Sequence, residues 1–309
     1  SYQGSLLGKM DKTLTSLTNN TDAQEAFKEQ LKETFSIGNM FAGLWFKIGQ
    51  MTLKNATAYN EATTSFNAAT GAAGEYNAAI EDASRGASAL GVGTTEAGAA
   101  MGALHANMSG FTNLSKTTAA TLAQGTAALE GLGISGATTA KTLDNLTKHM
   151  GLSAEAAMKQ QTELAKFAAG IGVAPAKMAE DFAAATPLLV KYGKAGEEIF
   201  KKLAKTAKST GIEMSKLLGL TEQFDTFEGA ASAAGKLNAI LGGPLLNSVA
   251  LLTASEDERI EMMRAAVAQS GKSWESMNRF EKQALMSAAG ISDLDTAGRL
   301  FGDNQEEVT

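Results

Sequence analysis

Apolar residues recur every three or four positions from Phe41 to Phe111, in a single seven-residue frame that lasts for about ten heptads. Of the 21 seam positions in this frame, 18 are apolar, compared with 44% of the whole chain. A sustained heptad pattern is typical of a helix whose apolar stripe packs against another helix. We therefore predict a coiled-coil-like helical rod of roughly 100 Å, at about 1.5 Å per residue, that associates with copies of itself.

The largest seam residues are the candidate contacts between copies of the chain. They are Phe41, Trp45, Ile48, Tyr59, Phe66, Tyr76, Ile80, Leu90, Leu104 and Phe111. Alanine and aromatic seam residues do not fix the number of copies, and a trimer is one candidate. Gly91 and Gly93 leave a second interpretation open, in which the rod is interrupted and forms two helices.

After Phe111 the pattern changes to short helical stretches, each ended by a glycine that an aliphatic residue follows. The markers are Gly133-Ile134, Gly151-Leu152, Gly172-Val173, Gly211-Ile212 and Gly290-Ile291. Each glycine is expected to end a helix, Ser135 and Ser153 to cap the next one, and Pro175 to begin one. The pattern predicts helices of about 14 to 18 residues, either as a true repeat or as an irregular helical domain.

The chain as a whole is predicted to be all-α, because only three prolines interrupt it. We expect four segments: 1–33, polar and helical; 34–115, the heptad-bearing rod; 116–227, the array of short helices; and 228–309, a C-terminal helical domain. In the last segment Gly242-Gly243-Pro244 predicts a turn. Capping boxes are predicted at Ser255 with Glu258, Asn278 with Glu281, and Ser292 with Asp295.

Candidate chemistry is sparse along the chain. No cysteine is present, which excludes disulfides and thiol chemistry, and the two histidines, His105 and His149, lack partners at ligand spacing. Glycine-rich strings at Gly91 and Gly271 lack the residues and the preceding strand of a nucleotide-binding loop. Acidic pairs such as Glu197-Glu198 fall in the first turns of predicted helices. We therefore expect no catalytic residue, metal or cofactor.

Charge argues against a specific nucleic-acid-binding surface, since the formal net charge is −6. One basic run exists, made of Lys191, Lys194, Lys201, Lys202, Lys205 and Lys208. A solvated helix face is the favoured interpretation of this run, and weak contact with nucleic acid or an acidic wall is the alternative.

The most apolar stretch is Thr34 to Phe46, which is shorter than the roughly 20 residues that span a bilayer. Thr34 to Leu53 reaches that length only if Lys47 is tolerated. Core or seam packing is the favoured interpretation, and a membrane-active helical translocation or pore factor is the alternative function.

Two strings in the last quarter of the chain resemble a segment of the tail tape measure proteins of tailed bacteriophages. They are KLNAILGGPLLNSVALLTASEDERI, from Lys236 to Ile260, and SWESMNRFEKQALMSAAGISDLDTAGRLFG, from Ser273 to Gly302. A looser similarity extends back through the short helices. The resemblance implies an elongated helical protein, in several copies, in the lumen of the tail tube of the virion.

The resemblance also implies partners and a role. Members of that family set tail length, plug the tube, contact tail tube and baseplate hub proteins, and leave ahead of the DNA at infection, when transient contact with the host membrane is expected. The predicted rod is short for a ruler of most tails. Some relatives carry a wall-degrading domain, but no position of this chain matches one.

Overall fold

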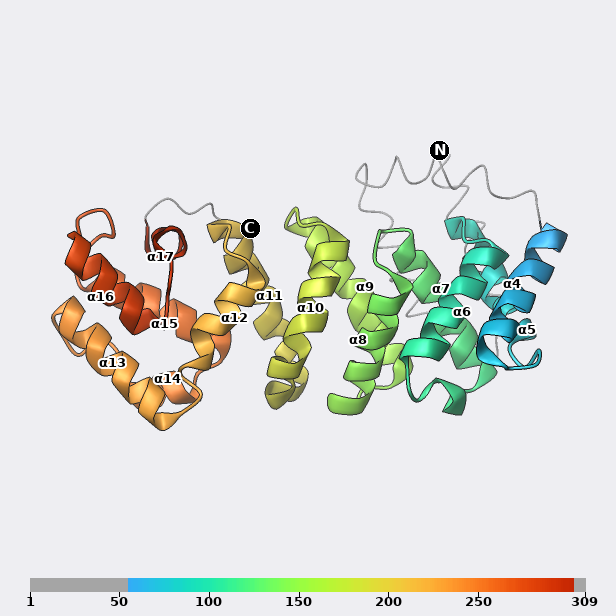
Figure 1. Ribbon diagram of the computed structural model, residues 1–309, viewed down its shortest axis with the longest axis horizontal. Helices are drawn as coiled ribbons and strands as arrows, with labels where there is room; N and C mark the ends of the chain where they lie inside the picture. The colour runs from blue at the N-terminus through green and yellow to red at the C-terminus, as the bar shows by residue number, and fades with distance from the viewer. Residues whose placement is uncertain (1–54, 303–309) are drawn as a thin grey trace. The chain divides into compact units, whose positions relative to one another are not determined.

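The computed structural model describes residues 55–302, and these fold into helices without any strand (Figure 1). The chain divides into two compact units, one ending at Thr186 and the other beginning at Pro187. The all-α prediction is confirmed for the part of the chain that the structure describes. The division falls inside the third predicted segment, 116–227.

The described part of the first unit is a succession of short helices joined by tight turns. Its elements are α4 (Asn55–Thr70), α5 (Asn77–Ala87), η2 (Ser88–Leu90), α6 (Thr94–Asn107), η3 (Phe111–Asn113), α7 (Lys116–Glu130), α8 (Gly136–His149), α9 (Ala154–Gly170) and most of α10 (Pro175–Leu189). The four helices α7 to α10 have 15, 14, 17 and 15 residues, as the glycine spacing predicts.

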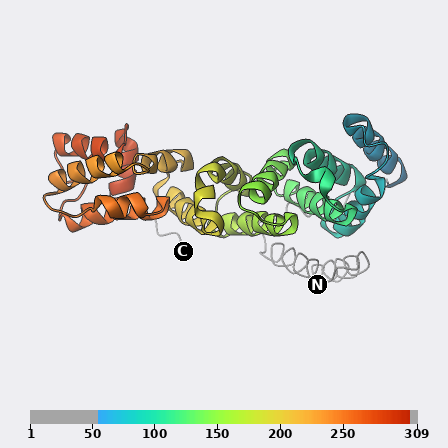
Figure 2. The same cartoon turned by 90° about the horizontal axis from the view of Figure 1, so that it is seen from below.

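Helices two places apart along the chain pack against each other in this unit. α4 packs on α6 and α6 on α8, while α5 packs on α7 and α7 on α9. Consecutive helices are also in contact, so the two stacks lie against each other as two layers, which can be followed in Figures 1 and 2. Each interior helix is thereby covered by neighbours on more than one side, as in helical solenoids.

Glycines lie where the stacked helices meet. A Cβ atom built on Gly98 of α6 would lie 2.9 Å from the Cβ of Ala62 in α4, and one on Gly125 of α7 would lie 2.7 Å from the sulfur of Met158 in α9. Gly86 of α5 faces the amide of Gln124 in α7 at a similar distance. These distances are too short for a side chain, so the glycines permit an approach that alanine would obstruct.

The predicted rod is not one helix in the described residues. It is divided at Gly71–Glu75 and again at Gly91–Gly93, so the interpretation that Gly91 and Gly93 break it is confirmed, and a second break was not expected. Gly71, Ala73, Gly74 and Gly91 all have positive φ, between 48° and 87°. Such residues cannot continue a right-handed helix, because that helix requires φ near −60°. The part of the rod before Asn55 lies outside the described residues.

The glycine markers of the later segments are confirmed as helix ends. Gly133, Gly151, Gly172, Gly211 and Gly290 have φ between 65° and 86°. After three of them the next N–H donates to a carbonyl five residues earlier: Ile134 to Leu129, Val173 to Ala168, and Ile291 to Met286. This is the pattern of a Schellman motif. Ser135 and Ser153 cap α8 and α9, and Pro175 is the first residue of α10, as predicted.

The second unit holds the remaining elements. They are η4 (Val190–Ala195), α11 (Gly196–Thr210), α12 (Met214–Glu222), α13 (Phe227–Leu241), α14 (Ser248–Thr253), α15 (Glu256–Gln269), α16 (Arg279–Ala289) and α17 (Leu294–Phe301). α15 packs on α11, α12 and α17, and α13 packs on α14 and α16. Its core contains the fully buried side chains of Phe200, Leu203, Leu217, Phe224, Leu251, Leu285 and Leu300.

Two of the three predicted capping boxes are confirmed, and one is displaced. Ser255 with Glu258 begins α15, and Asn278 with Glu281 begins α16. α17 is capped by Asp293, whose carboxylate accepts from the N–H of Thr296 at 2.7 Å, rather than by Ser292. Two adjacent residues could each accept this bond, so the local pattern did not distinguish between them.

Candidate functional site

The structure buries the predicted contact residues between copies inside the first unit. Phe66, Tyr76, Ile80, Leu90, Leu104 and Phe111 are each 5% exposed or less. Tyr59 is only partly buried, and Phe41, Trp45 and Ile48 lie outside the described residues. Within one chain the side chains of these six residues are already buried against other parts of that chain, and their predicted role in a seam between copies stays a prediction.

Three of these residues form an aromatic cluster with a histidine. The ring of Tyr76 lies 5.7 Å from that of Phe66 and 5.4 Å from that of Phe111, centroid to centroid. The imidazole of His105 lies within 6.2 Å of all three rings and meets them edge to face. Edge-to-face and tilted contacts of this kind stabilise a core beyond its buried area. His105 therefore packs with aromatic rings.

At the surface, the ammonium group of Lys116 packs over one ring of this aromatic cluster. The Nζ atom of Lys116 lies 3.5 Å from the centroid of the Tyr76 ring and forms an ion pair with Glu75. Lys116 begins α7, whereas Tyr76 directly precedes α5. The contact therefore joins the two helices by a cation–π interaction, which suits a structural site better than a reactive one.

The second unit contains a buried guanidinium that sequence reasoning missed. Arg259 of α15 is 2% exposed and donates to Asp225 at 2.7 Å. It also donates to the backbone carbonyls of Thr221, Leu251 and Leu252, at 3.0, 2.9 and 3.1 Å. Arg259 thus supplies donors to the carbonyls of Leu251 and Leu252 at the end of α14 and adds a second donor to the Thr221 carbonyl of α12, which also accepts from the N–H of Phe224.

Lys191 extends this charged network to η4. Its Nζ lies 3.0 Å from Asp225 and 2.9 Å from Glu256, a first-turn residue of α15 that is 3% exposed. Burial of Asp225 would raise its pKa, but the hydrogen bonds from Arg259 and Lys191 more than offset this, so the pKa lies below the ordinary value. Burial and the neighbouring Glu256 carboxylate raise the pKa of Tyr192 to about 12.

The basic run predicted from the sequence is paired with carboxylates over much of its length. Lys201 contacts Glu197 and Glu198 of its own helix, and Lys202 contacts Asp257 across to α15 at 3.0 Å. Together with Lys191, half of the six lysines therefore face acidic partners. This pairing favours the solvated and structural interpretation over an anion-binding surface, since neutralised lysines attract phosphate weakly.

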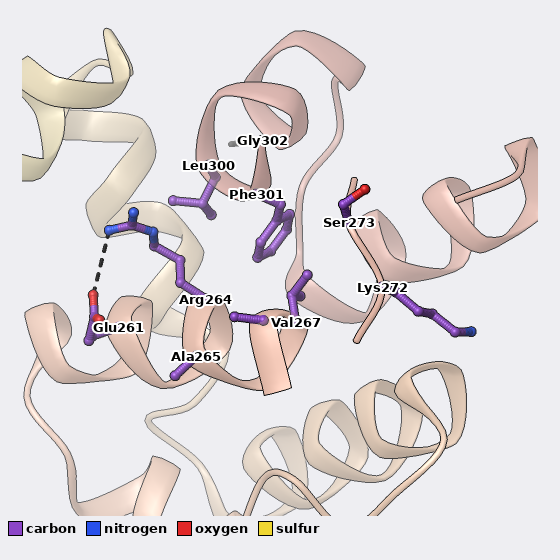
Figure 3. A pocket seen from close by; sticks show the side chains of 10 residues that line it. Glu261, Arg264, Ala265, Val267, Lys272, Ser273, Leu300, Phe301 and Gly302 are labelled. Atoms are coloured by element: carbon purple, nitrogen blue, oxygen red, sulfur yellow. Dashed lines mark ion pairs between the residues drawn. The ribbon is translucent and has the colours of Figure 1, made fainter. Parts of the chain in front are cut away.

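A surface hollow of about 310 Å³ lies between α15 and α17. Figure 3 shows Val267 and Phe301 facing each other in it, with Leu300 above, while Lys272 extends away. The Nζ of Lys272 instead contacts Glu281 and the carbonyl of Ile240, at 2.8 and 3.1 Å. Arg264 and Glu261 pair loosely at the rim, at 3.5 Å. Val267, Leu300 and Phe301 are themselves almost fully buried, so the hollow is an open surface depression whose exposed lining is more polar than apolar.

Residues 55–302 contain neither a metal-binding cluster nor a membrane-spanning helix. No cluster of three or more histidines and carboxylates is placed to hold a metal ion. No helix in this range is both long enough and apolar enough to cross a bilayer. The stretch Thr34 to Leu53, on which the membrane alternative rests, lies outside the range.

No family model matches the chain, no curated protein matches it, and no solved structure matches it.

Proposed function

We propose that this chain is a structural protein of a phage virion, a tail tape measure protein that lies in the tail tube and hub. It sets tail length, plugs the lumen, and is released before DNA ejection. The resemblance of Lys236–Ile260 and Ser273–Gly302 to that family carries the proposal.

The way the helices pack supports a structural role. The first unit consists of thin, alanine-rich helices that approach closely through glycines such as Gly98 and Gly125. Several of its polar side chains are used in caps and helix contacts, as those of Ser115, Ser135 and Gln161 are. A slender array of this kind fits a confined space, because small side chains keep each helix narrow.

The low charge of the stretch from Gly86 to Ala140 supports the same role. Only Glu96, Lys116 and Glu130 are charged between Gly86 and Ala140. A protein that must leave a narrow tube should adhere weakly to its wall, and few charges mean few long-range attractions to either sign of wall.

The proposal is tested by looking for the chain in virions of the phage whose genome encodes it. Antibodies against the purified chain should label purified tails before ejection and should lose that signal once the DNA has left. An in-frame deletion of residues 55–186 should also shorten the tails. Tails that never contain the chain, or a chain that stays in them after ejection, would contradict the proposal.

The alternative, a membrane-active translocation factor, depends on Thr34 to Leu53. It predicts leakage of liposomes by the purified chain and loss of leakage when Trp45 or Phe46 is replaced by Asp. No contact among the described residues favours it, so it stays a prediction.

A further inference from the structure

The helix α4 is held in the first unit mainly by one neighbour, α6. A Cβ atom built on Gly98 of α6 would lie 2.9 Å from the Cβ of Ala62, and the ring of Phe66 lies 5.9 Å from the imidazole of His105. α4 makes far less contact with α5, the next helix along the chain. The surface of α6 therefore forms a seat for α4, and the chain between them does little to fix it there.

The turn Gly71–Glu75 that joins α4 to α5 is strained. Ala73 has a φ of 48° and is the only non-glycine residue of the range 55–302 with a positive φ. This conformation brings the Cβ of an L-residue close to the following carbonyl oxygen. The Asn67 side chain fastens the turn by accepting from the N–H of Gly74 at 2.9 Å and donating to Asn77 at 3.0 Å. In a straight helix residues 67 and 77 would be about 15 Å apart, so both bonds belong to the closed turn.

The seven-residue frame continues through this turn without a shift. The seam positions from α4 to the end of α5 are all apolar: Tyr59, Ala62, Phe66, Ala69, Ala73, Tyr76, Ile80, Ala83 and Ala87. A turn can have any length, so a frame that stays in phase across it indicates that residues 55–87 can also form one continuous helix. Such a helix would be about 50 Å long and would carry α4 away from the α6 of its own chain.

We propose that two copies of this chain exchange α4 by straightening the turn. α4 of one copy then packs on α6 of the second, and α4 of the second packs on α6 of the first. The fold itself identifies the partner, because the surfaces that meet are those that already meet within one chain, with Ala62 of one copy against Gly98 of the other. Short connections under strain favour exchange of this kind.

Concentration decides between the closed chain and the exchanged dimer. Association costs the two copies translational and rotational freedom, which favours the closed chain in dilute solution. Straightening the turn relieves Ala73 and adds helical hydrogen bonds, but it places Gly71 and Gly74 inside a helix, where glycine is unfavourable. We expect closed monomers in dilute solution and dimers at high concentration. The inference goes beyond the proposed function, because it concerns the purified chain alone.

Sedimentation velocity on variants of the turn tests the exchange. Gly71→Ala combined with Gly74→Ala should lower the dissociation constant of the dimer at least about thirtyfold, because alanine favours the helix and is disfavoured at the φ of 69° and 87° in the closed turn. Ala73→Gly relieves the closed turn and should raise the dissociation constant about tenfold. Gly102→Ala, a glycine replacement in α6 with no atom closer than 4.0 Å, is the matched control and should leave it unchanged.

Spin labels show directly which copy supplies α4. The chain has no cysteine, so labels on Thr64→Cys and Ala99→Cys, at exposed positions of α4 and α6, report on these helices alone. A dilute chain that carries both labels gives the distance for packed α4 and α6. Two chains that carry one label each, mixed at high concentration, should give the same distance between labels. The same mixture kept dilute should show no such distance.

Three results would overturn the inference. They are a turn variant, Gly71→Ala with Gly74→Ala, that is folded by circular dichroism and stays monomeric at every concentration; dimers whose mixed labels lack the shared distance; and an equal change of the dissociation constant in Gly102→Ala. If the turn variant does not fold, the wild-type mixture at its highest concentration decides, since the shared distance supports the exchange and its absence overturns it. These outcomes do not depend on whether the chain is found in virions.

Discussion

The guanidinium of Arg259 donates to the carboxylate of Asp225 at 2.7 Å while Arg259 itself is 2% exposed. Replacing Arg259 by Gln should destabilise the second unit by about 1 to 3 kcal/mol, because the carbonyls of Leu251 and Leu252 lose their donor while the Asp225 carboxylate keeps only Lys191. Urea unfolding followed by circular dichroism measures this. Arg299→Gln, which removes a surface pair with Asp295, should cost less than about 1 kcal/mol. Equal effects of the two variants would show that the Arg259 network is not important for stability.

Two glycines of α6 should respond in opposite ways to alanine. At Gly102 the nearest atom to an added Cβ, on the Phe66 ring, is 4.0 Å away, so Gly102→Ala should stabilise the helix by up to about 1 kcal/mol. At Gly98 the Cβ of Ala62 would lie at 2.9 Å. Gly98→Ala should therefore be less stable than Gly102→Ala by about 1 to 3 kcal/mol, the usual cost of overpacking. Thermal unfolding of both variants decides this, and equal stabilities would mean that α4 and α6 are not held this closely.

The two explanations of the heptad pattern make different predictions for Ile80. If Ile80 faced only another copy, Ile80→Asp would yield a folded monomer. Because the side chain is 0% exposed within one chain, we expect the substitution to cost at least about 4 kcal/mol and to abolish cooperative melting of the first unit. Ala68→Asp, at an exposed position of α4, should leave melting nearly unchanged. A folded, monomeric Ile80→Asp variant would instead support the interpretation that Ile80 contacts another copy of the chain.

Acid should weaken the second unit through Asp225. Its pKa is lowered in the folded state, so its contribution to stability is complete above the ordinary unfolded value of about 3.9 and is lost as the pH falls through the folded pKa. Unfolding free energies measured from pH 6 down to pH 2 should therefore fall below about pH 4. Asp225→Asn should be less stable at pH 6 and should show a shallower fall; an identical pH profile would exclude this role for Asp225.

Tyr192 should titrate unusually late in alkali. Its pKa is raised to about 12 by burial and by Glu256, whereas an unfolded tyrosine ionises near 10. The folded state then holds the phenol proton more tightly, so stability falls as the pH rises from about 10 to 12. Subtracting the ultraviolet titration of Tyr192→Phe from that of the wild type isolates this group. A midpoint near 10 would mean that Tyr192 does not face Glu256.

Short-range sequence signals were sufficient to predict where several helices begin and end. The glycines at 133, 151 and 172, the caps Ser135 and Ser153, and Pro175 act through bonds within a few residues, so the sequence around each one decides its conformation. The all-helical class follows from the same signals. The net charge, the lack of cysteine and the scarcity of paired histidines and carboxylates can likewise be determined from the sequence alone.

Tertiary structure alone decided which surface each apolar stripe meets. The stripe that contains Phe66, Ile80 and Leu104 has the same spacing whether its partner is another chain or a later helix of this one, and the turn from Gly71 to Glu75 directs it to the latter. The partners of Arg259 lie at Thr221, Asp225 and Leu251, and the hollow of the second unit joins α15 to the end of α17. Such contacts depend on how distant segments pack, because a periodic pattern specifies the buried face of a helix but not the helix that covers it.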